Sequence, residues 1–326
     1  MPQSKAAQTA SGGSAGALGD DGAGPAATEK GRDPLRFSRR VDREHPPIGR
    51  FVDTPTGPLH FVEQGNPDDP TLVMLHGASG NLLDFKSSIL DALSARWRVI
   101  AVDRPGYGHS AARGPRPWGV KEQVVSIEHV LRACGARRYA LFGHSYGVAL
   151  SIAWCALRGD QVRGVLALSG GMYDWPGAQS WRYRLGRIGP LGAGMGRLAP
   201  FFATPDLLRR EMAEVFAPQA PPEDYAERAG VWLALRPRTF ALNLKAMAEM
   251  LNELEPVRPL LGQLSPPVEV VNGDADEICA PTPAGPYAAR LPLARLTWLK
   301  GVGHMPHHVA PIPVLSACDR LRERLA

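Results

Sequence analysis

Short apolar runs and amphipathic stretches alternate along most of this chain. The apolar runs suit buried strands of a parallel sheet, and the stretches between them have helical spacing. Strands are expected at 50–53, 59–63, 71–75, 99–102, 139–142, 165–168, 268–271 and 296–299, the first two forming a hairpin. Helices are expected near 83–95, 120–134, 147–158, 283–291 and 307–324. This alternation predicts an α/β fold with a mostly parallel eight-stranded sheet and helices on both faces.

The alternation stops between Gly171 and about residue 259. No strand pattern occurs there, whereas 205–216, 222–235 and 239–251 have helical spacing. We therefore expect a core made of 46–171 and 260–326, with a helical cap, 172–259, inserted after the sixth strand. The aromatic residues of the cap either pack inside it or line an apolar substrate pocket, and the pocket candidates are Trp175, Trp181 and Trp232.

Residues 1–45 lack this patterning. They are rich in alanine, glycine, serine and aspartate and hold few large apolar side chains. Such a segment cannot bury enough apolar surface to offset the entropy that it would lose on ordering. We therefore expect a disordered tail over 1–45.

Composition and charge narrow the classes of function. The net charge of +5 is mildly basic, but basic residues form neither a run nor a stripe, so nucleic-acid binding is not expected. No apolar run reaches the roughly 18 residues that a spanning helix needs, and no apolar signal segment precedes residue 40, so stable membrane insertion is not expected. The scattered cysteines suggest reduced thiols and a cytoplasmic protein; they are Cys134, Cys155, Cys279 and Cys318.

A serine follows the strand at 139–142 within the segment Gly143-His144-Ser145-Tyr146-Gly147. With a helix predicted behind it, this pattern indicates a sharp strand-to-helix turn that exposes the serine hydroxyl. Small residues two positions on either side allow the strand and the helix to approach each other. Ser145 is therefore the candidate nucleophile.

A serine nucleophile needs a base to accept its proton and a carboxylate to orient that base. His304 lies in a glycine-rich loop just past the last predicted strand, and Asp276 follows the strand at 268–271. Asp274 and Glu277 are close rivals of Asp276. The order serine, aspartate, histidine along the chain suits this architecture, and we take Asp276 as the carboxylate.

The negative charge of a tetrahedral intermediate needs backbone N–H donors. Tyr146, directly after the serine, supplies one candidate. The glycine-containing loop 76–81, after the strand at 71–75, supplies Ala78 as the second. We interpret His76, at the start of this loop, as a structural anchor.

Taken together, these motifs resemble the alpha/beta hydrolase superfamily, in particular its capped members. The resemblance spans about residues 50 to 326 and rests on 75–80, 103–110, 143–147, 273–276 and 303–306. It implies a structural role for Asp103 in the second of these segments. Capped members include esterases, carbon–carbon bond hydrolases, epoxide hydrolases and haloalkane dehalogenases. The last two groups use an aspartate at the position of Ser145, so neither activity is expected here.

The resulting prediction is a serine hydrolase that cleaves a small or medium apolar carboxylic ester through an acyl-enzyme, without a cofactor. Ser145, Asp276 and His304 form the triad, and the amides of Ala78 and Tyr146 form the oxyanion hole. Two alternatives stay open, namely carbon–carbon hydrolysis or acyl transfer by the same triad, and a non-catalytic ligand-binding role. The partner expected is a small apolar acyl compound, and a homodimer is left open.

Two further patterns are set aside. The segment 192–196 resembles a dinucleotide-binding loop, but no strand precedes it. The histidines of 304–308 resemble a metal cluster, but no carboxylate or cysteine lies at ligand spacing from them. We therefore expect no metal site.

Overall fold

The computed structural model describes residues 33–171, 189–279 and 287–325. The expected disordered tail lies outside these residues up to position 32. Trp175 and Trp181, and the first part of the helix expected at 283–291, also lie outside them.

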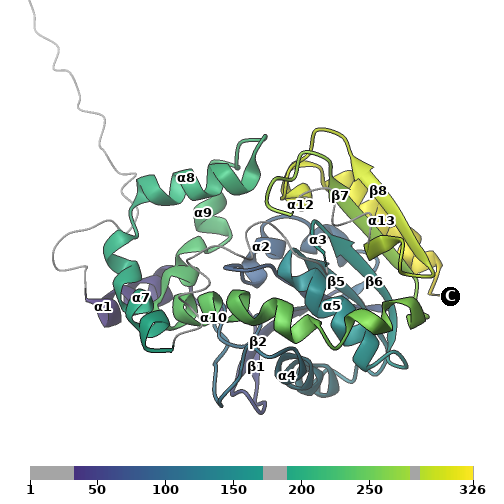
Figure 1. Ribbon diagram of the computed structural model, residues 1–326, viewed down its shortest axis with the longest axis horizontal. Helices are drawn as coiled ribbons and strands as arrows, with labels where there is room; N and C mark the ends of the chain where they lie inside the picture. Colours follow the sequence, from purple (N-terminus) through teal and green to yellow (C-terminus); the bar gives the residue numbers. More distant parts are fainter. Residues whose placement is uncertain (1–32, 172–188, 280–286, 326) are drawn as a thin grey trace, which may run out of the picture.

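Eight strands form one sheet in the order β1-β2-β4-β3-β5-β6-β7-β8 (Figure 1). β1 pairs antiparallel with β2, and β2 with β4, while all other neighbouring strands are parallel. The mostly parallel sheet is therefore confirmed, with each strand close to its expected position. The strands are β1 (Arg50–Val52), β2 (Leu59–Gln64), β3 (Thr71–Leu75), β4 (Arg98–Val102), β5 (Tyr139–His144), β6 (Val162–Leu168), β7 (Val268–Gly273) and β8 (Ala294–Leu299).

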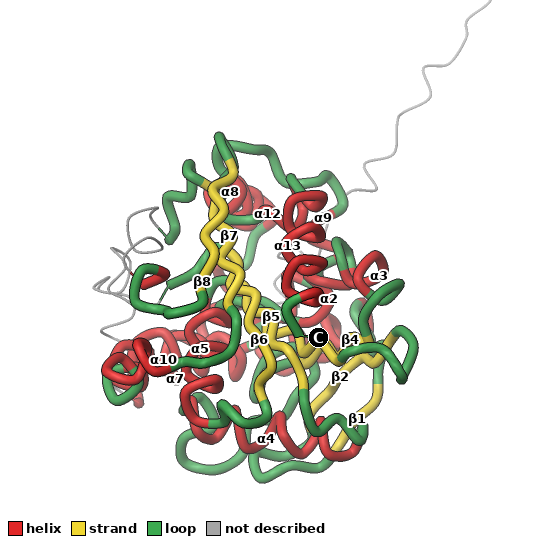
Figure 2. Tube along the Cα trace, turned by 90° about the vertical axis from the view of Figure 1, so that its right-hand side faces the viewer, coloured by secondary structure: helices red, strands yellow, loops and turns green. Residues whose placement is uncertain are grey.

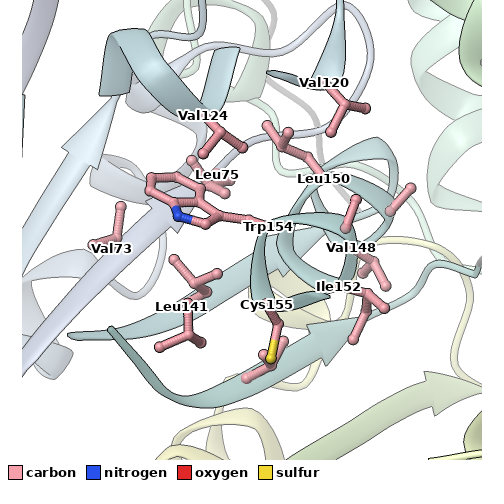
Figure 3. Close-up of a cluster of buried hydrophobic side chains, with 14 of the residues drawn as sticks. Val73, Leu75, Val120, Val124, Leu141, Val148, Leu150, Ile152, Trp154 and Cys155 are labelled. Carbon is pink, nitrogen blue, oxygen red and sulfur yellow. The ribbon is translucent and has the colours of Figure 1, made fainter. Parts of the chain in front are cut away.

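Helices cover both faces of the sheet (Figure 2). One face packs against α4 (Val120–Ala133), α5 (Tyr146–Leu157) and α10 (Pro237–Leu254), and the other against α2 (Leu82–Lys86), α3 (Leu90–Leu93) and α13 (Pro311–Glu323). Trp154 of α5 is fully buried between α4 and strand residues such as Val73 and Leu141 (Figure 3). Burying a large apolar side chain in this way stabilises the fold by roughly 2 kcal/mol.

The parallel strands bring the candidate residues to one edge of the sheet. β3, β5, β7 and β8 run in the same direction, so their carboxyl ends lie together. The loop with Ala78 follows β3, Ser145 follows β5, Asp276 follows β7 and His304 follows β8. Ligands of open parallel sheets bind at this edge, so the topology favours a single site there.

Two expected helices are each divided in the structure. The stretch 83–95 forms α2 and α3, because the hydroxyls of Ser87 and Ser88 donate to the carbonyl of Asp84 and end the first helix. The stretch 307–324 forms α12 (Pro306–Val309) and α13, because Pro311 has no N–H to continue the helix.

Helices fill the described residues between β6 and β7, and we call residues 189–263 the helical insertion. It contains α7 (Gly189–Phe202), α8 (Pro205–Phe216), α9 (Tyr225–Arg228), η3 (Val231–Leu235), α10 and η4 (Arg258–Gln263). α7 was not predicted, because its glycines and Pro200 are poor helix formers. It packs along α10, and this tertiary contact outweighs the weak local propensity.

The prediction of a disordered tail is wrong for the last part of residues 1–45. Residues 34–44 form a helix, α1 (Pro34–Glu44), with Asp33 as its N-cap. Its buried side chains, Phe37 and Val41, are only two residues in a polar stretch, so the sequence signal is weak. They pack against Leu208 and Trp232 of the helical insertion, which supplies the apolar surface that the segment alone lacks.

Trp232 therefore has a different role from the one expected. Its side chain is buried in the cluster with α1, between Phe37 and Leu233. The structure places it in the packing between α1 and the insertion.

No helix among the described residues is long and apolar enough to cross a membrane.

We expect the substitution Phe37→Ala to lower the free energy of unfolding by about 3 kcal/mol, because it leaves a cavity between α1 and the insertion. Urea unfolding of the full chain measures this change. Leu35→Ala is the matched control, since Leu35 lies on the same helix and is 69% exposed. Equal effects of the two substitutions would show that α1 does not contribute its buried face to stability.

Candidate active site

Ser145 lies at a sharp turn between β5 and α5. Its backbone has φ 53° and ψ −117°, a conformation that is unfavourable for a residue with a side chain. The close approach of strand and helix enforces this turn, because a Cβ on Gly147 would overlap the carbonyl oxygen of Leu75 in β3. The strain therefore belongs to the strand–turn–helix packing, as the sequence pattern indicates.

His304 and Asp276 form a hydrogen-bonded pair. His304 Nδ1 donates to Asp276 Oδ2 at 2.9 Å, and the Asp276 side chain is fully buried. The other oxygen, Oδ1, accepts from the backbone N–H groups of Ile278 and Cys279. Because Nδ1 carries the proton in this pair, the Nε2 atom of a neutral His304 is free to accept one.

The rival carboxylates lie elsewhere. Asp274 is exposed, and its Oδ1 accepts from the backbone N–H of Gly301. Glu277 is also exposed. Of the three candidates, Asp276 is the carboxylate that the fold brings to His304.

The hydroxyl of Ser145 contacts the thiol of Cys279. No direct hydrogen bond links Ser145 to His304 among the described residues. Burial and the neighbouring Asp276 charge raise the pKa of Cys279, so the thiol stays protonated. Catalytic hydrogen bonds often tighten only when substrate is bound. Sequence reasoning missed Cys279, because nothing in its local pattern places it beside a serine 134 positions earlier in the chain.

His144 connects the serine turn to the histidine loop. Its Nε2–H donates to the backbone carbonyl of His304 at 3.0 Å, and the two rings lie 5.0 Å apart. Burial lowers the pKa of His144 well below its ordinary value, so the ring is neutral. The residue next to Ser145 thus fixes the backbone of His304.

The loop after β3 lies against the serine. A Cβ on Gly77 would come within 3.0 Å of the Cβ of Ser145. The carbonyl of Gly77 accepts a hydrogen bond from Arg104, and in a trans peptide the next N–H, that of Ala78, points in the opposite direction. Neither Ala78 nor Tyr146 donates its amide to another group among the described residues. Both amides therefore retain a free N–H close to Ser145.

Arg104 is a positioning residue that sequence reasoning missed. Its guanidinium is fully buried, donates to the carbonyls of His76 and Gly77, and stacks on the rings of Tyr107 and Tyr146 at 4.2 and 4.3 Å. It holds the loop after β3 and the residue after Ser145 together. The sequence did offer one sign of this role, because Arg104 follows Asp103 in the segment 103–110, which carries part of the family resemblance.

The structural roles expected for Asp103 and His76 are confirmed. Asp103 accepts from His60 Nδ1 and from the backbone N–H groups of Leu82 and His109. His76 donates from Nδ1 to the Gly77 carbonyl and accepts from the Arg104 amide at Nε2. Both side chains are buried and tie loops together.

The helical insertion contacts both loops of the site. Asn243 of α10 accepts from the backbone N–H of Ser79 and donates to its hydroxyl. Gln219 accepts from the backbone N–H of Gly303 and donates to the carbonyl of Gly301. The insertion thus holds the loop with Ala78 and the loop with His304.

A further group of side chains has the donor types of a metal site. Asp84, His307 and His308 place one potential ligand atom each within 4.8 Å of one another, and they lie beside His144.

Comparison with known proteins agrees with this geometry. A model of the alpha/beta hydrolase family matches residues 72–317. The chain belongs to the alpha/beta hydrolase family. The expected fold is therefore shown, and the eight-stranded sheet is that of an alpha/beta hydrolase.

The relatives of this alpha/beta hydrolase have different names. It is 27% identical over 262 residues to the magnesium-chelatase 30 kDa subunit of Rhodobacter capsulatus, covering 78% of this chain and 88% of that protein. It is 31% identical over 168 residues to epoxide hydrolase B of Mycobacterium tuberculosis, covering 48% of this chain and 47% of that protein. A thermophilic esterase from Thermogutta terrifontis shares its fold, with a TM-score of 0.68 at 20% identity over 85% and 99% of the two chains.

The buried histidines of this alpha/beta hydrolase make its stability depend on pH. Burial, followed by the charge of Arg104, lowers the pKa of His76 from 6.5 to about 3. Between these values the unfolded chain binds a proton at His76 that the folded chain does not, so acidification favours unfolding. We expect the free energy of unfolding to fall by about 1.4 kcal/mol per pH unit below pH 6.5 from this residue alone. The pKa of Asp103 is also lowered in the folded chain. Its contribution to the free energy of unfolding is therefore lost only at lower pH, below 3.8, the pKa of this carboxyl in the unfolded chain.

Urea unfolding at a series of pH values between 7 and 5 measures this slope. His76→Gln removes the titrating ring. The slope of the free energy of unfolding against pH should then fall by the amount that corresponds to about one bound proton. A wild-type free energy of unfolding that stays constant over this range would contradict a neutral buried His76.

Proposed function

We propose that this alpha/beta hydrolase is a serine esterase that acts on a small or medium apolar carboxylic ester. The observation that carries the proposal is the strained serine turn beside a histidine whose Nδ1–H is held by a buried aspartate. This arrangement leaves one basic nitrogen on His304 and one hydroxyl on Ser145 at the same edge of the sheet. Nucleophilic catalysis by serine requires both.

In the proposed mechanism Ser145 Oγ attacks the ester carbonyl carbon while His304 Nε2 accepts the hydroxyl proton. The carbonyl oxygen becomes an oxyanion and accepts hydrogen bonds from the amides of Ala78 and Tyr146. His304 then gives its proton to the leaving alcohol, and the acyl group stays on Ser145. His304 next takes a proton from water while the water oxygen attacks the acyl carbon. The acyl–Oγ bond then breaks, His304 returns the proton to Ser145 Oγ, and the acid leaves. Asp276 orients His304 and stabilises its charged form in both steps.

The residue at the turn separates this proposal from the other activities in the family. Relatives of this chain include an epoxide hydrolase and a haloalkane dehalogenase, and both groups use an aspartate at this position. Ser145 carries a hydroxyl, which attacks an acyl carbon with the help of His304. Carbon–carbon hydrolysis and acyl transfer use the same triad, and they differ only in the bond that is broken and in the acceptor. An assay with an added alcohol acceptor distinguishes transfer from hydrolysis.

A non-catalytic ligand-binding role is the second candidate. One relative that aligns over most of both chains is named as a subunit of a chelatase and not as a hydrolase. In addition, no hydrogen bond links Ser145 to His304 among the described residues. Binding of an apolar acyl compound without turnover would favour this role.

We expect Ser145→Ala, His304→Gln and Asp276→Asn each to lower kcat on chromogenic esters by about 10³-fold or more, because the three side chains act as one unit. Hydrolysis of an ester series of increasing acyl length measures this effect. Epoxides and haloalkanes should not be turned over, because Ser145 replaces the aspartate that those reactions use.

Ser316→Ala is the matched control, since Ser316 is exposed on α13. Retention of more than a few per cent of ester hydrolysis in folded Ser145→Ala would disprove the serine mechanism. Absence of turnover on every ester by the folded wild type would favour the binding role.

We also expect Arg104→Lys to lower kcat by about 10-fold with little change in KM, because an ammonium group cannot hold both the His76 and the Gly77 carbonyls. Steady-state kinetics on the preferred ester measures the two constants separately. Arg132→Lys, at an exposed position of α4, is the control and should leave both constants unchanged. An unaltered kcat in a folded Arg104→Lys variant would show that Arg104 does not position the oxyanion loop.

A further inference from the structure

A buried polar cluster lies behind the serine turn. Asp84 is placed between two imidazoles: its Oδ2 accepts from His307 Nε2 at 2.9 Å and its Oδ1 accepts from His308 Nε2 at 2.9 Å. Tyr225 of α9 donates its hydroxyl to Asp84 Oδ1 at 3.1 Å. All three ligand-type side chains are almost fully buried. The cluster is separate from Ser145, Asp276 and Ala78.

The fold supplies the carboxylate that the local sequence lacks. His307 and His308 lie on α12, and Asp84 lies on α2, more than two hundred positions earlier. The absence of a nearby carboxylate was the argument against a metal at these histidines. That argument fails, because one ligand atom each from Asp84, His307 and His308 lies within 4.8 Å of the other two.

We propose that Asp84, His307 and His308 bind a divalent transition-metal ion, with Zn²⁺ as the best match. Two imidazole nitrogens and one carboxylate oxygen are a common ligand set for Zn²⁺, and they leave a fourth position for water. A cation there also compensates the buried carboxylate charge of Asp84, which otherwise relies on hydrogen bonds alone. The proposal does not depend on the ester hydrolysis proposed above.

Binding requires each imidazole to present Nε2 as a lone pair. In the metal-free cluster Nε2 of His307 and of His308 carries the proton that is donated to Asp84. On binding, each proton moves to Nδ1 of the same ring, and the Nε2–metal and oxygen–metal bonds replace the two hydrogen bonds.

The ring of His144 lies beside that of His307. The two rings lie 4.5 Å apart, and Nδ1 of each is buried with no hydrogen-bond partner among the described residues. Because His144 Nε2–H donates to the His304 carbonyl, its Nδ1 is a bare acceptor. In the metal-bound form His307 Nδ1 becomes a donor, so the pair then holds one donor and one acceptor instead of two acceptors. Metal-bound histidines commonly donate their second N–H in this way.

Aromatic side chains surround the cluster. The rings of Phe216 and Tyr225 lie 5.6 and 5.0 Å from that of His308, and Phe85 lies 5.9 Å from His307. An apolar shell of this kind limits exchange with water. The ion would fix α12, which begins two residues after His304, to α2.

The test measures metal binding directly, without an activity assay. The full chain is stripped of metal with a chelator and titrated with Co²⁺, whose visible absorption bands report nitrogen and oxygen coordination, and Zn²⁺ is then added in competition. We expect one ion per chain, a rise in Tm with Zn²⁺, and a Kd about 100-fold weaker in His308→Gln. Tyr225→Phe keeps the three ligands and loses the hydrogen bond to Asp84, so its Kd should weaken by about 10-fold.

His129→Gln is the matched control, because His129 lies on α4 across the sheet from the cluster. Its affinity should equal that of the wild type. Absence of stoichiometric binding by the wild type would overturn the proposal. Equal affinity of the wild type and His308→Gln would also overturn it, since the ion would then lie elsewhere. If His308→Gln does not fold, the Tyr225→Phe affinity decides, and an unchanged value counts against the site.

Discussion

The close packing of β3, β5 and α5 around Ser145 is the constraint on which the rest of the site depends. The backbone of Ser145 is held at φ 53°, which costs of order 1–3 kcal/mol for such a residue. Its amide donates to the Leu168 carbonyl of β6, and the adjoining Gly147 leaves room for the Leu75 carbonyl of β3. The buried side chains of α5 hold the helix against the sheet, so the core supplies the energy that maintains the strain.

Buried polar side chains then align the loops with this turn. Arg104 holds the carbonyls of the loop after β3, and His144 holds the carbonyl of His304. Burial keeps the ring of His144, and likewise that of His76, neutral, so each ring can donate from one nitrogen and accept at the other. Fixed protonation makes the direction of each hydrogen bond definite, and the loops are held in one arrangement.

The helical insertion is part of the same arrangement. Asn243 contacts the loop with Ala78, Gln219 contacts the loop with His304, and Tyr225 contacts Asp84. Three elements of the insertion therefore reach the carboxyl edge of the sheet. A displacement of the insertion would therefore alter the loop with Ala78 and the loop with His304 together.

The sequence by itself determined the strands, the sheet type, the serine turn and the candidate residues Ser145, Asp276 and His304, because these depend on local periodicity and on short motifs at strand ends. The sequence-based predictions for α1 and α7 failed for a common reason. α1 is stabilised by a face that Phe37 and Val41 share with a distant helix, and α7 forms despite glycines because it packs along α10. Only the tertiary structure decided between Asp276 and its neighbours, placed Cys279 at Ser145, and brought Asp84 to His308. Contacts between residues far apart in the chain depend on how whole elements pack, and local spacing carries no information on that packing.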